Sequence, residues 1–259
     1  IAIGIFDQAK DAPYDFARFA EQYYDAMGHS PAMMLTMLDL LYRVAGADGV
    51  FHLAAQPLVS VSYSNPVETI STNVLGTTNI LEALKELKHN CIGIIITSDK
   101  CYENVGATRP YNENDALGGH DLYSASKACA EIISQAYRAS FYQGHDKVGV
   151  ATARAGNVIG GGDWAKDRIV PDAIRAFREN NILKIRNPDA IRPWQHVLEP
   201  LSGYLSLAEH LYTDPESFSS SWNFGPHLND TVSVASLCDV LVNHYGGETT
   251  WEFEQPQNP

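Results

Sequence analysis

The sequence predicts an α/β fold in which a doubly wound parallel sheet is followed by a smaller C-terminal lobe. Short apolar runs alternate with longer stretches whose apolar residues recur at helical spacing, which is typical of parallel strands joined by helical crossovers. From about residue 163 the alternation weakens, and Pro, Trp, Arg and His become more frequent. We therefore expect a sheet domain over residues 1–162 and a lobe over residues 163–259, with some later segments returning to the sheet.

The individual elements follow from the spacing of apolar residues. Runs with the length and composition of buried strands cover residues 1–6, 50–53, 92–96 and 148–153. Residues 14–46 are polar and then helical, and longer helices are expected over residues 66–88 and 123–142. Pro66 suits the first turn of its helix, because proline lacks the amide hydrogen that would be unpaired there.

The most informative motif is Tyr123-Ser124-Ala125-Ser126-Lys127. On a helix this spacing places Tyr123 and Lys127 on one face, about one turn apart. A nearby ammonium favours the phenolate and brings a tyrosine, whose free pKa is about 10, into the range of a working base. Two surface residues on an amphipathic helix would give the same spacing.

Polar residues upstream favour the catalytic interpretation. The apolar run 92–96 leads directly into Thr97, Ser98, Asp99 and Lys100. Because the carboxyl ends of parallel strands meet at one edge of the sheet, that edge is where such folds hold ligands and catalytic groups. The sequence thus predicts an active site formed by residues 97–100 and the Tyr123 helix.

Composition limits the partners and the compartment. The formal net charge of −13 argues against nucleic acid or an anionic membrane as the main partner. No stretch approaches the roughly 18 apolar residues of a membrane span. The cysteines show no paired metal-ligand spacing, so we expect no metal site and a cytoplasmic protein with reduced thiols at Cys91, Cys101, Cys129 and Cys238.

A Rossmann-type dinucleotide fold normally opens with a strand and a glycine-rich turn, and no such turn follows the run 1–5. We expect that strand and turn to precede residue 1, and further chain to follow residue 259. The acidic residue that binds the adenosine ribose usually ends the second strand, and Asp7 stands there if the run 1–6 is that strand. A simple strand end explains Asp7 equally well.

Five longer runs carry a family resemblance: residues 50–59, 97–104, 118–121, 153–164 and 192–201. They resemble the extended short-chain dehydrogenase/reductase superfamily and, within it, the nucleotide-sugar 4,6-dehydratases, most of all the CDP-glucose group. The runs Ser-Asp-Lys-Cys-Tyr-Glu-Asn and Arg-Pro-Trp-Gln-His-Val-Leu-Glu-Pro are the most specific. Residues 28–34 depart from the Asp-Ile-Arg-Asp stretch that the family usually has beside the adenine.

The resemblance implies NAD as cofactor and CDP-glucose as substrate. The hexose is oxidised at C4, loses water across C5 and C6, and receives the hydride back at C6. Tyr123 would take the proton of the C4 hydroxyl, and Lys127 would lower the pKa of Tyr123 and hold the nicotinamide ribose. Thr97 or Ser98 would hydrogen-bond the same hydroxyl, and alignment with the family favours Ser98.

Elimination needs an acid at O6 and a base at C5. Asp99 is the expected acid, and desolvation should raise its pKa so that it stays protonated. Lys100 stands where relatives acting on dTDP-glucose carry a glutamate base. It would either act as the base, with a pKa lowered by burial, or stabilise the enolate electrostatically.

The resemblance also implies two sets of binding residues. The cofactor would contact Asp7, Leu53, Ala54, Ala55, Asn73 and Thr97, in addition to Tyr123 and Lys127, although a structural role explains Asn73 as well. The substrate would contact Gln56, Asn157, Arg168 and Arg192, although salt bridges in an acidic chain explain Arg168 equally well. Arg154 is expected to give structural support, and His52 and His196 to be hydrogen-bonded core histidines.

Two other functions remain open. An epimerase or decarboxylase of the same superfamily uses the same Tyr and Lys but usually carries Ser or Thr at the position of Asp99. A catalytically silent nucleotide-binding fragment or assembly subunit is the second. By family analogy we expect a homodimer whose interface consists of the helices that begin near Pro66 and Tyr123.

Overall fold

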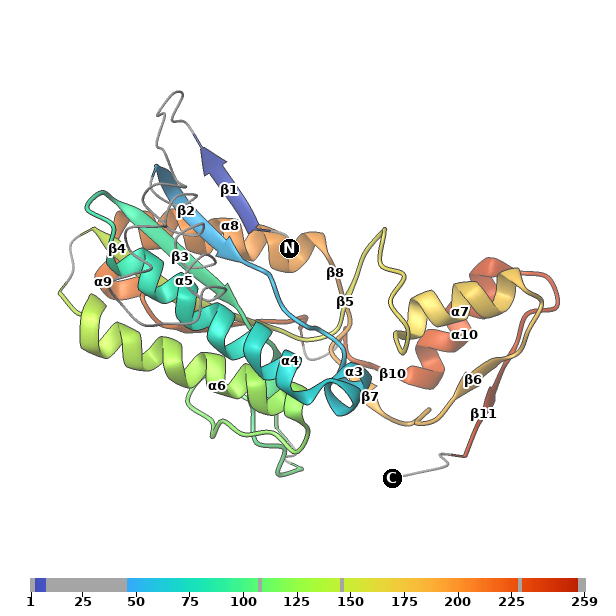
Figure 1. The fold of residues 1–259 in the computed structure, drawn as a ribbon. Helices are drawn as coiled ribbons and strands as arrows, with labels where there is room; N and C mark the ends of the chain where they lie inside the picture. The colour runs from blue at the N-terminus through green and yellow to red at the C-terminus, as the bar shows by residue number, and fades with distance from the viewer. Residues whose placement is uncertain (1–2, 8–45, 107–108, 145–146, 228–229, 256–259) are drawn as a thin grey trace, which may run out of the picture. The chain divides into compact units, whose positions relative to one another are not determined.

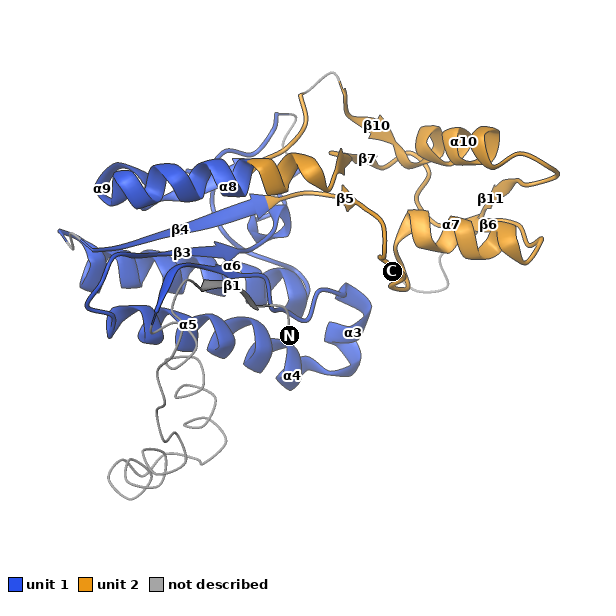
Figure 2. Ribbon diagram, turned by 90° about the horizontal axis from the view of Figure 1, so that it is seen from above, with its two compact units in different colours: residues 1–154, 203–223 blue, residues 155–202, 224–259 orange. Residues whose placement is uncertain are grey.

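The computed structural model describes residues 3–7, 46–106, 109–144, 147–227 and 230–255. Two compact units divide the chain, one formed by residues 1–154 with 203–223 and the other by residues 155–202 with 224–259 (Figure 2). The division therefore falls at residue 154 rather than at the predicted boundary of 162. Residues 203–223 return to the first unit because β9 (Ser221–Phe224) adds to the edge of the main sheet beside β4.

The first unit is built on a five-stranded sheet of order β1-β2-β3-β4-β9. Its strands β2 (Ala47–His52), β3 (Cys91–Ile96) and β4 (Val148–Ala155) are parallel, as the sequence predicts. The carboxyl ends of β3 and β4 are in register, with Ile96 paired to Ala153. Residues 97–100 therefore begin at the same edge of the sheet at which β4 ends.

Strand β1 (Ile3–Asp7) departs from the expected parallel direction. It runs antiparallel to β2, with Ile3 opposite His52 and Asp7 opposite Ala47. A strand at the edge of a sheet has a single neighbour, and a short apolar run can pair with that neighbour in either direction. The helical stretch predicted within residues 14–46 lies outside the described residues up to residue 45, as do residues 28–34, which depart from the family pattern.

Helices cover both faces of this sheet (Figures 1 and 2). One face carries α4 (Pro66–Ile70), the π-helix η1 (Ser71–Leu75), α5 (Gly76–Lys85), α6 (Leu122–Tyr137) and the π-helix η3 (Arg138–Tyr142). The other carries the part of α8 (Leu198–Thr213) that belongs to this unit, together with α9 (Pro215–Phe218). The doubly wound α/β fold predicted from the sequence is thus confirmed.

Two glycines in the central strands allow leucine side chains of the covering helices to approach the strand backbone. A Cβ on Gly93 of β3 would lie 2.4 Å from Leu84 Cδ1 of α5. A Cβ on Gly149 of β4 would lie 2.9 Å from Leu211 of α8. Helices on opposite faces therefore approach the backbone of β3 and β4, and these two strands form the buried centre of the unit.

The second unit combines helices with short paired strands. It contains α7 (Ile169–Arg178), α10 (Val234–Tyr245) and three two-stranded ladders. Strand β6 (Leu183–Ile185) is parallel to β11 (Trp251–Phe253), and β5 (Val158–Ile159) is parallel to β8 (Gln195–His196). Strand β7 (Ile191–Arg192) is antiparallel to β10 (Val232–Ser233). Its core gathers around the buried side chains of Ala173, Phe177, Leu183, Ile185 and Cys238.

Candidate active site

The turn that follows β3 brings three of the predicted catalytic residues together. Residues Asp99–Cys101 form the 3-10 helix η2, which Ser98 caps by accepting a hydrogen bond from Lys100 N at 3.2 Å. The Ser98 hydroxyl also donates to Asp99 Oδ1 at 3.1 Å. Thr97 and Ser98 are buried, Asp99 is half-buried and Lys100 is exposed.

Helix α6 presents Tyr123 and Lys127 as buried side chains of one face. The Lys127 ammonium donates to the backbone oxygen of Ile96 at 3.1 Å, at the end of β3. Burial lowers the pKa of Lys127 to about 8, while the charge of Glu131 and the Cys101 thiol act in the opposite direction. The helix and the turn after β3 are thereby joined at one position.

Two local features set the start of α6. Asp121 caps the helix by accepting hydrogen bonds from Ser124 N at 2.9 Å and Ser124 Oγ at 2.7 Å. A Cβ on Gly119 would lie 2.4 Å from Ala125 N, so only glycine allows the preceding loop to pass this close to the helix. The cap and the glycine together place the first turn, which carries Tyr123.

The loop after β2 is held to α6 through Asn73. Asn73 Oδ1 accepts from Gln56 N at 2.8 Å, and Asn73 Nδ2 donates to Gln56 O at 3.1 Å and to Ser126 Oγ at 2.8 Å. Asn73 lies in the π-helix η1, a type of helix that is frequent at functional sites. These bonds support the structural role for Asn73, because they tie the loop containing Ala54 and Ala55 to the residue preceding Lys127.

The side chain of Gln56, predicted to contact substrate, hydrogen-bonds within the protein. Its Nε2 donates to Leu58 O at 3.0 Å and to Thr69 Oγ1 at 2.9 Å, and its Oε1 accepts from Leu58 N at 2.6 Å. The Gln56 side-chain amide therefore stabilises the conformation of the loop after β2. Leu53 is exposed in this loop, and Ala54 and Ala55 are half-buried, as cofactor-lining positions would be.

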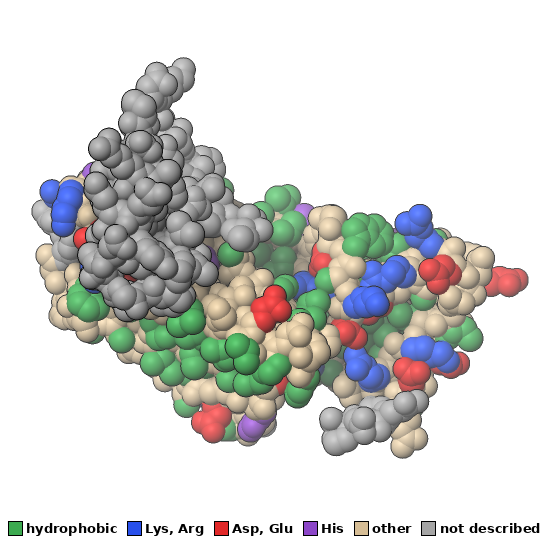
Figure 3. Space-filling model, viewed as in Figure 1, with side chains coloured by type: hydrophobic (Ala, Val, Ile, Leu, Met, Phe, Trp, Pro, Cys, Tyr) green, Lys and Arg blue, Asp and Glu red, His purple; other side chains and the backbone are tan. Residues whose placement is uncertain are grey.

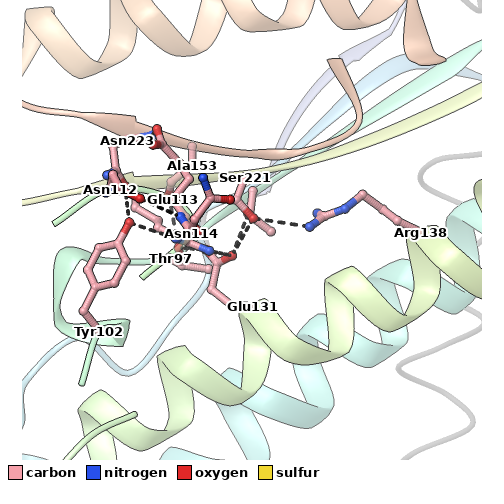
Figure 4. A network of polar contacts seen from close by, with 12 residues as sticks. Thr97, Tyr102, Asn112, Glu113, Asn114, Glu131, Arg138, Ala153, Ser221 and Asn223 are labelled. Carbon is pink, nitrogen blue, oxygen red and sulfur yellow. Dashed lines mark hydrogen bonds and ion pairs between the residues drawn. The ribbon is translucent and has the colours of Figure 1, made fainter. Parts of the chain in front are cut away.

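A buried polar network centred on Glu131 lies beside this site (Figure 4). The Glu131 carboxylate accepts from Thr97 Oγ1, from Thr152 Oγ1 at 2.8 Å and from Arg154 Nη2 at 2.8 Å. Burial acts to raise the pKa of Glu131, but these donors outweigh it and hold the pKa below its usual value. Glu131 is thus an ionised carboxylate in the interior.

The network continues from Arg154 to the end of the turn after β3. Arg154 Nη1 donates to the Tyr102 hydroxyl at 2.8 Å, and that hydroxyl donates to Asn223 Oδ1 at 2.7 Å. The predicted structural role of Arg154 agrees with these contacts. Glu131 is not among the residues predicted from the sequence, although a carboxylate four residues after Lys127, on the buried face of an amphipathic helix, is a usable signal.

Of the two histidines expected to be hydrogen-bonded in a core, His196 is exposed, whereas His52 is buried at the end of β2. Burial, and to a smaller extent the charge of Lys127, lowers its pKa to about 4. Neither ring nitrogen has a hydrogen-bond partner among the described residues. A neutral imidazole therefore faces the Lys127 side of the site.

The predicted substrate-binding residues other than Gln56 come from the second unit. Asn157, Arg168 and Arg192 belong to the second unit. Arg168 forms a 3.1 Å ion pair with Asp163, and Arg192 is exposed. Asp7 pairs with Ala47 at the start of β2, at the edge of the sheet opposite Thr97, so the structure does not bring Asp7 to the other predicted residues.

Comparison with known proteins identifies the family. Residues 36–258 match the family model described as GDP-mannose 4,6 dehydratase. The chain is 51% identical over 215 residues to the CDP-glucose 4,6-dehydratase of Salmonella typhimurium, covering 81% of this chain and 60% of that protein. A UDP-glucose 4-epimerase of Mycoplasma pneumoniae is 29% identical over 189 residues, covering 69% of this chain and 56% of that protein.

Solved structures show the same fold. A dTDP-glucose 4,6-dehydratase from Streptomyces venezuelae, with NAD bound, superposes with a TM-score of 0.70 at 18% identity, covering 85% of this chain and 65% of that one. A UDP-glucuronic acid 4-epimerase from Bacillus cereus, with UDP-glucuronic acid and NAD, gives 0.72 at 21% identity, covering 84% and 65%. In the described residues, no helix is both long and apolar enough to cross a membrane.

The chain thus spans about 60% of the length of the Salmonella relative and 65% of these two solved chains. The family match nevertheless covers most of this sequence, including every described residue of the Tyr123 helix and of the turn after β3. It confirms the resemblance drawn from the sequence runs. The chain belongs to the GDP-mannose 4,6 dehydratase family.

Proposed function

We propose that the protein containing this chain is an NAD-dependent nucleotide-sugar 4,6-dehydratase, with CDP-glucose as substrate. The observation that carries the proposal is the hydrogen bond from Lys127 to Ile96 O, which joins the Tyr/Lys helix to the turn bearing Ser98, Asp99 and Lys100. The 51% identity to a CDP-glucose 4,6-dehydratase supports the choice of nucleotide.

The residues of the first unit suit NAD as the cofactor. Lys127 is an ammonium with three N–H donors, one of which is bonded to Ile96 O, and ribose hydroxyls are suitable acceptors for such a group. The half-buried Ala54 and Ala55 permit close approach at the carboxyl edge of the sheet. When bound there, NAD supplies a hydride acceptor for C4 that later returns the hydride to C6.

Tyr123 takes the proton of the C4 hydroxyl, and Ser98 hydrogen-bonds the same hydroxyl. The carbonyl formed at C4 makes the C5 proton acidic, so that the C5–H bond breaks, the proton passes to solvent water at the exposed Lys100, and the electron pair is held as an enolate. A proton returns to C5 when the hydride is returned to C6. Asp99 then protonates the departing O6 hydroxyl, which leaves as water. The Ser98–Asp99 hydrogen bond at 3.1 Å supports this assignment, because it keeps the two side chains together in one turn.

Lys100 has the role of an electrostatic stabiliser in this proposal, because its side chain is exposed rather than buried. The two roles left open by the sequence can be separated with matched variants. Lys100→Arg keeps the positive charge but cannot lose a proton near neutral pH, whereas Lys100→Met removes both functions. Activity retained by Lys100→Arg and lost by Lys100→Met supports the stabiliser; equal loss in both identifies a base.

We further propose a homodimer formed through α4, η1 and α6. Figure 3 shows hydrophobic side chains gathered on the face formed by these helices. Exposed apolar residues there and on the adjoining α3 (Val59–Ser64) and η3 are Tyr63, Val67, Leu75, Leu122, Ile132 and Phe141. Contiguous exposed apolar surface of this kind favours association between protein chains.

Turnover of CDP-glucose, beside dTDP-, UDP- and GDP-glucose, tests the function. A 4-keto-6-deoxy product from CDP-glucose, absent in Asp99→Asn and Tyr123→Phe, is the expected result. A C4 epimer without loss of water would replace the proposal with the epimerase. Absence of both turnover and NAD binding would favour a silent nucleotide-binding module.

A further inference from the structure

Glu131 shares a helix stripe with the proposed catalytic pair. It lies one turn after Lys127 and two turns after Tyr123 on α6, and all three side chains are buried. Its side chain is 1% exposed, so the carboxylate lies between the helix and the sheet. Nothing in the proposed dehydration requires a carboxylate at this position to touch the hexose.

Donors from three strands converge on the Glu131 carboxylate (Figure 4). Thr97 follows β3, Thr152 and Arg154 lie on β4, and Ser221 of β9 donates at 3.1 Å. Buried charges persist where they are paired and hydrogen-bonded in this way. The carboxylate consequently ties α6 to the residue directly before Ser98.

We propose that Glu131 is a positioning residue, which holds α6 against the end of β3 and supplies the negative charge that faces the Lys127 ammonium from one turn away. The inference rests on the proposed function, in which Lys127 acts on Tyr123. Glu131 therefore acts through Lys127 and Thr97 and has no contact with substrate.

Glu131 differs from the other side chains around Lys127 because it carries a charge at pH 7. Besides Tyr123, which precedes Lys127 by one turn on α6, the titratable groups that interact with the Lys127 charge are His52 from β2, Cys101 from η2 and Glu131 from α6. His52 is neutral at pH 7 because burial, with the Lys127 charge, lowers its pKa to about 4. Cys101 is neutral because burial raises the pKa of its thiol to about 12. Of these three groups, Glu131 alone is charged at pH 7.

The charged side chains around Glu131 are arginines. Arg154 of β4 binds it directly, and Arg138 of η3 lies close enough for the Glu131 charge to act on its pKa. Arg138 also donates to Ser221 Oγ at 3.3 Å, and that hydroxyl donates to Glu131. A purely structural ion pair with Arg154 would explain these contacts without any effect on Lys127, so the test must separate the two roles.

The test is the titration of Lys127 in the complete, NAD-free protein, followed by NMR of ¹³C-labelled lysine side chains and assigned with Lys127→Arg. Glu131→Gln keeps the shape of the side chain and removes its charge. Combining it with Arg154→Met also removes the unpaired guanidinium, which provides a folded variant if the single change unfolds the protein. Thr152→Val removes one hydrogen bond to the same carboxylate and leaves its charge.

We expect the pKa of Lys127 to fall by about one unit or more in Glu131→Gln, to fall by less in the double variant because Arg154→Met also removes a positive charge, and to stay within a few tenths of a unit of the parent value in Thr152→Val. The basic limb of the pH profile of kcat should move to lower pH by the same amount in Glu131→Gln. Folded Glu131 variants in which Lys127 titrates as in the parent would overturn the proposal. If the enzyme turns over none of the nucleotide sugars, the proposed function fails, while the NMR titration still decides the role of Glu131.

Discussion

The Lys127 ammonium is bonded to the backbone oxygen of Ile96, the last residue of β3, over 3.1 Å. A helix residue and a strand end are thereby linked at the carboxyl edge of the sheet, directly before Thr97 and Ser98. Burial at this edge lowers the pKa of Lys127 to about 8. Because Tyr123 lies on the same helix, the hydrogen bond also fixes where Tyr123 stands relative to the end of β3.

Asp121→Ala should weaken the start of α6. Loss of the hydrogen bond from Ser124 N should cost about 1 kcal/mol of folding stability, as for other N-caps, and the first turn carrying Tyr123 should loosen. Asp214→Ala is the matched control, because Asp214 caps α9 in the same way through Ser217 N at 3.1 Å. Denaturant unfolding and kcat should be measured for both; equal loss of kcat in the two variants would contradict a special role for the α6 cap.

The stability of the NAD-free protein should depend on the titration of Lys127. Because its folded pKa of about 8 lies below the ordinary value of 10.5, the unfolded chain binds more protons between these two values. Stability should therefore rise with pH across that interval, by about 3 kcal/mol in total, relative to Lys127→Met. The difference in unfolding free energy between parent and variant, measured at several pH values from 7 to 10.5, checks this; a constant difference would refute it.

His52 should destabilise the protein in acid. Its folded pKa of about 4 lies below the ordinary value of 6.5, so protons bind preferentially to the unfolded chain as the pH falls through this range. The parent should lose about 3 kcal/mol more than His52→Leu between pH 6.5 and 4. Acid unfolding followed by circular dichroism measures the difference, and His120→Leu, at an exposed histidine, serves as control.

Ile132→Glu should dissociate the proposed homodimer. Ile132 lies on α6 and is 51% exposed in the single chain, and a charge buried at an apolar interface is costly. Val240→Glu is a close control, since Val240 on α10 is also 51% exposed but lies in the second unit. Sedimentation equilibrium at micromolar concentration should give dimers for the parent and Val240→Glu, and monomers for Ile132→Glu. A monomeric parent would remove the basis of the proposal.

Much of the first unit was predictable from the sequence because its signals are local. The apolar run ending at Ile96 is a buried strand, and the four-residue spacing of Tyr123 and Lys127 places both on the buried side of one helix. Both features depend on residues within a few positions of each other, where the helical and strand periods fix the direction of side chains.

The tertiary structure decided what depends on distant residues. The direction of β1 and the return of residues 203–223 to the sheet follow from pairings across long stretches of chain. Glu131 is the clearest case, because its donors Thr97, Thr152, Arg154 and Ser221 converge only when three strands assemble beside α6. The sequence by itself determined the parallel strands β2, β3 and β4, the helices that follow Pro66 and precede Tyr142, and the Tyr/Lys pair; only folding could bring together the buried charges that surround that pair.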